Sequence, residues 1–125
     1  MSSNFILWLP QDVVEGVDRF VDRGLFGTRS DFVRDSIRHG LIRIRGMMRQ
    51  PSPGESLRAL YEENDSSFLG SIDLEELNAR STGTIRIFVS DRLAESLHSI
   101  PLGLYLLDFI RVCVIRNLES LEMLL

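Results

Sequence analysis

Three consecutive residues, Thr28, Arg29 and Ser30, carry two hydroxyl groups and one guanidinium group. We expect them at the start of a helix, because Thr28 is a good N-cap and Asp31 stands at the reciprocal capping-box position, where Glu or Gln is more usual. Free backbone amides and the positive end of the helix dipole attract anions at such a start. The three residues therefore predict a phosphate-binding site; the alternative is a helix cap without a ligand.

The apolar pattern around these residues predicts the elements that hold them in place. A short apolar run at residues 4–9 ends at Pro10 and is typical of a strand. Apolar residues then recur at helical spacing from residue 11 until Gly24, and again from residue 28 to residue 44. The predicted order is strand, helix, tight turn and helix. A single strand has unpaired backbone groups, so this unit needs a partner strand from its own chain or from a second copy.

The end of the chain resembles its beginning. Residues 84–89 alternate apolar and other side chains, as a half-buried strand does. A shift of 80 residues aligns Leu7 and Leu9 with Ile87 and Val89. After a deletion of three residues, a shift of 77 aligns residues 31–34 (Asp-Phe-Val-Arg) with residues 108–111 (Asp-Phe-Ile-Arg). The pattern indicates an internal repeat whose two strands pair antiparallel.

The sequence thus divides into a first unit at residues 1–50, a connector at 51–83 and a second unit at 84–125. The connector holds seven acidic residues against two Arg. We expect it to carry short helices at about 52–64 and 73–80, with a loop at 65–70, on the outside of the core. The last helix, with Val112, Cys113, Val114 and Ile115 in a row, should be deeply buried or contact another subunit.

Residues 4–10 and 24–37 resemble the ribbon-helix-helix superfamily, the Arc, MetJ and CopG type of repressor. The resemblance covers about residues 4–44, and it rests on the apolar strand ending in Leu9-Pro10 together with the Thr28-Arg29-Ser30 helix start. It implies a mainly α fold, a tandem ribbon-helix-helix with a degenerate second copy, in which two strands form one antiparallel ribbon over a helical core. It also implies binding of double-stranded DNA by a small transcriptional regulator, with the ribbon in the major groove.

Site residues follow from the same resemblance. The second helix would hold a backbone phosphate at Thr28, Arg29 and Ser30. Outward side chains of the two strands would read base edges, namely Asn4, Ile6, Trp8, Thr84, Arg86 and Phe88. Arg86 is the residue that we expect to discriminate most, because Arg can bond guanine O6 and N7 together. The alternative is a solvated Arg86 covered by the connector and paired with Glu75 or Glu76.

The sequence departs from the family at several of these positions. Ile6 and Trp8 are large and apolar where polar residues are usual, so we expect them to be buried or to contact a partner. The second copy has Tyr105, Leu106 and Leu107 in place of the phosphate site. A second hypothesis is therefore a protein-interaction or assembly module that uses an apolar ribbon face, as an antitoxin-like protein would. The repeat would allow a single chain to fold as a pseudo-dimer, and the apolar Ile6, Trp8 and last helix lead us to expect dimers of chains.

Charge and composition limit the other classes. The net charge is -4, yet residues 1–50 carry eight Arg against six acids, so the acidity belongs to the connector. His39, His98 and Cys113 show no metal-ligand spacing, and no nucleophile or glycine-rich phosphate motif is present. We therefore expect no enzyme, no cofactor and no metal. A single Cys, no apolar run near ~18 residues and no signal peptide favour a cytoplasmic protein outside the membrane.

Overall fold

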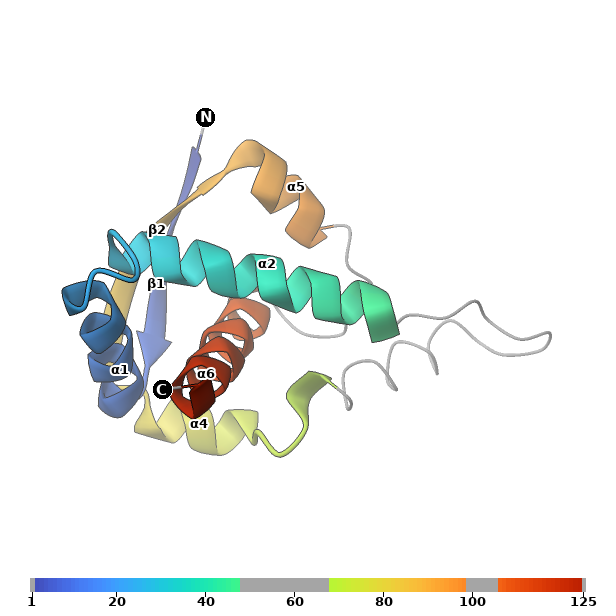
Figure 1. Ribbon diagram of the computed structural model, residues 1–125. Helices are drawn as coiled ribbons and strands as arrows, with labels where there is room; N and C mark the ends of the chain where they lie inside the picture. Colours follow the sequence, from blue (N-terminus) through green and yellow to red (C-terminus); the bar gives the residue numbers. More distant parts are fainter. Residues whose placement is uncertain (1, 48–67, 99–105, 125) are drawn as a thin grey trace.

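The computed structural model describes residues 2–47, 68–98 and 106–124. It is mainly helical and has one two-stranded antiparallel sheet, as the sequence predicts (Figure 1). The elements in chain order are β1 (Ser2–Leu9), α1 (Gln11–Asp22), α2 (Arg29–Met47), α4 (Leu74–Arg80), β2 (Gly83–Ser90), α5 (Asp91–His98) and α6 (Leu106–Leu124). None of the helices in these ranges is long and apolar enough to cross a membrane.

The two strands pair with each other within one chain, which confirms the predicted pairing. The register places Ile6 opposite Arg86, and the pairs on either side are Phe5 with Ile87 and Leu7 with Ile85. In β2, burial alternates strictly from residue to residue, so one face of the ribbon lies on the core and the other faces solvent.

The turn between α1 and α2 is built as the sequence predicts. Arg23 ends α1, and Gly24 follows with φ of 78°, a left-handed conformation that glycine adopts without steric cost. The Thr28 hydroxyl accepts a hydrogen bond from the Asp31 amide at 3.1 Å and so caps the first turn of α2.

The core lies between the inner face of the ribbon and the helices, with α1, α2 and α6 as its main walls. Its fully buried members from the strands and the two long helices are Leu7, Leu9, Phe32, Val33, Ile37, Ile85, Ile87, Val89, Ile110, Val112 and Val114. Helix α6 is buried at six consecutive positions, 109–114, which confirms the deep burial predicted for the last helix, although Ile115 is only half-buried.

Helices α2 and α6 cross in contact beneath the ribbon. Gly40 makes the approach possible, because a Cβ atom built there would lie 2.3 Å from the Cys113 Sγ. Beside this contact, Asn117 Nδ2 donates to Ser36 Oγ at 3.0 Å, a buried polar pair between the same two helices.

The described part of the connector corrects two expectations. Asp73 caps α4 as predicted and accepts from the amides of Glu75 and Glu76. Five of the seven residues of α4 are exposed, so this helix lies on the outside of the core as expected, but Leu77 and Phe68 are 5% and 1% exposed and contribute to the core. Phe68 is also helical, where a loop was expected. The helix expected at about 52–64 lies outside the described residues.

Candidate nucleic-acid interface

All six predicted base-reading residues lie on the solvent side of the ribbon, and we call their surface the outer ribbon face. Its members are Asn4, Ile6, Trp8, Thr84, Arg86 and Phe88, and each is exposed. Ile6, Trp8 and Phe88 keep 46%, 56% and 51% of their surface in solvent. Of the two outcomes expected for Ile6 and Trp8, burial by the described chain does not occur, because both side chains point away from the core, and contact with a partner stays a prediction.

Cross-strand pairs order this face. Ile6 lies opposite Arg86 at the centre, and the outer pairs are Asn4 with Phe88 and Trp8 with Thr84. Each outer pair thus joins an aromatic residue to a small polar one, and the aromatic residue is on β2 in one pair and on β1 in the other. At the centre, β1 has an apolar residue and β2 has a guanidinium. Arg86 is the one charged side chain on the outer ribbon face, and nothing in the described connector covers it, since Glu76 pairs with Arg80 instead.

The beginning of α2 lies beside the middle of the ribbon. Ser30 Oγ donates to the Arg86 carbonyl oxygen at 3.5 Å, a long hydrogen bond. Thr28 and Arg29 are exposed at the same end. The structure thus brings the three predicted phosphate-binding residues together, next to the outer ribbon face and on the first turn of a long helix.

Arg29 already has a partner there. Its Nε and Nη2 donate to the two carboxylate oxygens of Asp18, on α1, at 2.6 and 2.7 Å. These hydrogen bonds hold the pKa of Asp18 below its ordinary value and raise the pKa of Arg29. A phosphate at this position would have to share or replace the Asp18 carboxylate.

Arg34, one turn further along α2, joins the helix to the opposite strand. Its Nη1 donates to the Phe88 carbonyl oxygen at 3.0 Å, and its Nη2 pairs with Asp31. The hydrogen bond from Arg34 also keeps the pKa of Asp31 below its ordinary value. The predicted pair between residues 31 and 34 is present, and it has this additional attachment to β2.

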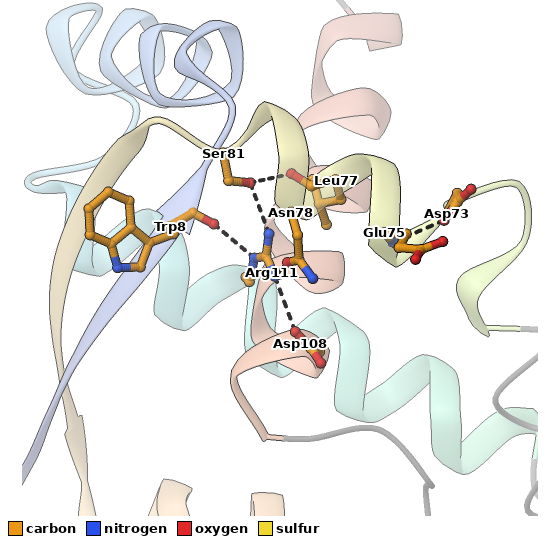
Figure 2. A network of polar contacts seen from close by, with 8 residues as sticks. All are labelled: Trp8, Asp73, Glu75, Leu77, Asn78, Ser81, Asp108 and Arg111. Atoms are coloured by element: carbon orange, nitrogen blue, oxygen red, sulfur yellow. Dashed lines mark hydrogen bonds and ion pairs between the residues drawn. The ribbon is translucent and has the colours of Figure 1, made fainter.

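Arg111 makes the corresponding contacts in the second half (Figure 2). Its Nε donates to the Trp8 carbonyl oxygen at 2.8 Å, while Nη1 contacts Asp108 and Asn78 and Nη2 donates to Ser81. Its side chain is 7% exposed. The expectation of an ordinary surface pair is therefore wrong for Arg111, because α4 and its C-cap residue Ser81 cover the guanidinium. Figure 2 also shows the Trp8 indole pointing away from Arg111.

The part of the chain that the structure describes holds no group of side chains arranged to bind a metal ion. No three His, Cys, Asp or Glu side chains converge there at a distance that could hold a metal ion. His39 lies 3.4 Å from Asp35 on the exposed side of α2. Cys113 is buried, and burial raises the pKa of its thiol.

Comparison with known proteins adds no relative: no family model matches the chain, and no curated protein or solved structure matches it significantly. Function must therefore be argued from the site itself.

Two features of this site were not predicted from the sequence. The Asp18–Arg29 ion pair joins residues on different helices, and Asp18 looks like any other acid on the polar face of α1. The burial of Arg111 depends on α4, whose position the sequence does not specify. The repeat did offer a signal for the Arg111 contact with β1, because its counterpart Arg34 contacts the other strand.

Proposed function

We propose that this chain binds duplex DNA as a small sequence-specific transcriptional regulator, with a tandem ribbon-helix-helix fold and with the outer ribbon face in the major groove. The observation that carries the proposal is the strand register. Under the repeat shift of 80 residues, Ile6 corresponds to Arg86, and these two residues are paired at the centre of the ribbon. Six of the seven other pairs form three pairs of mirror images, as two identical subunits would give, and Ser2 with Ser90 is the exception.

Helix contacts support the same two-fold relation. Arg34 corresponds to Arg111 under the shift of 77, and Phe88 corresponds to Trp8 under the shift of 80. Arg34 bonds the Phe88 carbonyl and Arg111 bonds the Trp8 carbonyl, so each half holds the strand of the other by the same contact. We infer that one chain contains a pseudo-dimer of two ribbon-helix-helix units, the second of which has lost the phosphate site.

In this proposal Arg86 provides the sequence preference. It stands at the middle of the ribbon, where a side chain reaches deepest into the groove, and bidentate bonding to guanine contributes roughly 1–3 kcal/mol of discrimination. Asn4 and Thr84 read more weakly, while Ile6, Trp8 and Phe88 contact thymine methyl groups or exclude water. Thr28, Arg29 and Ser30 fix the position on a backbone phosphate and carry no sequence information.

Selection from random duplex DNA, followed by gel shifts of the selected site at two salt concentrations, tests the proposal. We expect a defined site whose affinity falls steeply with salt. Arg86→Ala should lose the preference at one or two guanine positions, whereas Arg38→Ala, an exposed Arg on α2 outside the interface, should keep it. No enriched sequence and no salt-dependent binding would refute DNA binding.

Asp18 gives a second, sharper test of the phosphate site. Arg29→Ala should weaken binding to all DNA alike and lower the salt slope by about one unit. Asp18→Asn should do the opposite, because it frees Arg29 and removes a negative charge from the phosphate position. An equal loss of affinity in both variants would mean that the ion pair, and not Arg29 alone, supports binding.

A second candidate function is a protein-interaction or assembly module, and the apolar character of the outer ribbon face favours it. Ile6, Trp8 and Phe88 expose apolar surface there, and a depression of about 320 Å³ beside Trp8 continues to Leu107. In this case Ile6→Ser should dissociate a complex or a dimer of chains while leaving the fold intact. Light scattering of the parent and the variant distinguishes this outcome from DNA binding by a lone chain.

A further inference from the structure

The outer ribbon face keeps two-fold symmetry in its outer pairs and loses it at the centre. Each outer pair joins a small polar residue to an aromatic one, so the shift of 80 residues that relates the two strands preserves the chemistry there. At the centre, the same shift exchanges Ile6 and Arg86, an apolar side chain and a guanidinium. The surface therefore has a direction, although the strand register beneath it is symmetric about this central pair.

The β2 edge of the ribbon is polar and positively charged. Ser30 and Arg34, from the beginning of α2, donate to carbonyl oxygens of β2. Arg29 is exposed next to them, and Arg86 is exposed on the outer ribbon face. Arg29 and Arg34 are paired with carboxylates of α1 and α2, whereas Arg86 has no carboxylate partner among the described residues. Arg86 therefore supplies this edge with a positive charge that no carboxylate neutralises there.

The β1 edge is apolar instead. Ile6, Trp8 and Leu107 line a depression at this edge, and each is at least 40% exposed. Leu107 replaces the hydroxyl that α2 has at the corresponding position of the repeat. The charged members of the lining are Arg111, which is 7% exposed, and Asp108, which is 23% exposed and negative. The depression thus offers an approaching phosphate no exposed cation.

We propose that one chain recognises a non-palindromic element of duplex DNA, with its charged contacts toward one DNA strand and its apolar contacts toward the other. The inference deepens the proposed function and rests on it. A ribbon in the major groove lies between two phosphate backbones, so each of its edges faces one of them. The β2 edge faces the backbone that Arg29 holds, and Arg86 bonds a guanine at the centre of the element. The β1 edge holds no phosphate, and Ile6 and Trp8 contact thymine methyl groups, the apolar feature of the groove.

The orientation of the central base pair tests the inference. The element obtained by selection is made as a duplex of about 14 base pairs, little more than one helical turn, so that it holds one ribbon. Inverting the central G·C pair should weaken binding by about tenfold, because Arg86 loses its guanine. Inverting a base pair at the end of the duplex, outside the ribbon, is the control and should change nothing. An element that reads the same on both strands, or a central inversion without effect, would overturn the inference while DNA binding stands. If no element is enriched at all, the proposed function fails and this inference fails with it.

Neutral methylphosphonate linkages, placed on one DNA strand at a time, test the two edges separately. Neutralising the backbone that faces the β2 edge should weaken binding and lower the salt slope by about one unit, the loss of one phosphate contact. The same change on the other strand should have little effect. Arg29→Ala should remove most of the difference between the two strands. Equal losses from both strands in the parent would show that the second half also holds a phosphate, and the inference would be wrong.

Ile6→Arg gives the ribbon a symmetric centre, with one guanidinium on each strand. Position 6 is exposed, so the variant should keep the fold, and circular dichroism checks this. We expect it to prefer an element with a guanine on each DNA strand at the centre and to lose most of the orientation effect. Ile6→Leu keeps the centre apolar and should behave like the parent. If Ile6→Arg keeps the parent's orientation preference in full, residue 6 does not face the bases and the inference fails.

Discussion

The two halves of the molecule use the same contact in different surroundings. Arg34 and Arg111 each bond a carbonyl oxygen of the other half's strand and an Asp three residues earlier on their own helix. The Arg34 side chain is 29% exposed, whereas that of Arg111 is 7% exposed and gains Asn78 and Ser81 as further acceptors. The Arg34 guanidinium therefore stays partly open to solvent beside the ribbon, and the Arg111 guanidinium is covered by α4 and Ser81.

Under the proposed function, this difference separates a corner that holds the fold together from a corner that would bind a phosphate. A buried guanidinium with four acceptors holds α6, α4 and β1 together. The open corner keeps Thr28 and Arg29 at the surface, where a phosphate can reach them. Under the proposed function only the first half would bind a backbone phosphate, because the second half has Leu106 and Leu107 where the first has Arg29 and Ser30.

The largest effect should come from Arg111→Ala. Removal of the buried guanidinium leaves the half-buried Asp108 and the Trp8 carbonyl without their partner, while the exposed Asn78 can bond water instead. Loss of hydrogen bonds to a charged group costs roughly 3 kcal/mol at the upper end. Urea unfolding monitored by circular dichroism measures the change. A cost no greater than that of Arg34→Ala would show that α4 does not protect this corner from water.

Gly40→Ala should rank next. The new methyl group would overlap the Cys113 sulfur, and crowding of this kind in a packed core costs about 1–3 kcal/mol. Cys113→Ala opens space at the same point, so the double variant should be more stable than the sum of the two single changes predicts. If the two single changes in unfolding free energy simply add up in the double variant, the crowding caused by Gly40→Ala does not involve Cys113.

Arg34→Ala should cost less than either, roughly 1 kcal/mol, because water can replace a half-exposed hydrogen bond. The informative quantity is the difference in unfolding free energy between Arg34→Ala and Arg111→Ala, since the two residues make equivalent contacts. Hydrogen exchange at the end of β2 should rise in Arg34→Ala, because the Phe88 carbonyl loses its attachment to α2. Unchanged exchange there would contradict a role for Arg34 in holding the strand.

Local pattern was enough to predict most of the fold. The alternation of side chains predicted which face of each strand is buried, and the helical spacing of apolar residues predicted α1, α2 and α6. Gly24 and Thr28 predicted the two ends of the turn. The repeat predicted which strands pair. Burial of Phe68 and Arg111 could not be predicted, because it depends on where the connector lies in space. The Asp18–Arg29 pair was missed for the same reason: a solvent-facing acid takes its partner from the packing of two helices.

The smallest effect on stability should come from Asp18→Asn, which removes the charge that neutralises Arg29. Both side chains are more than a third exposed, so the pair contributes only about 0.2–1 kcal/mol and less at high salt. The pKa of Asp18 is lowered in the folded chain, so its contribution is complete above the unfolded pKa of ~3.9 and disappears as pH falls through the folded value. Parent and variant should therefore differ near neutral pH and converge in acid. A difference that persists in strong acid would mean that the substitution acts through packing, and the open corner would then have no charge pair for a phosphate to displace.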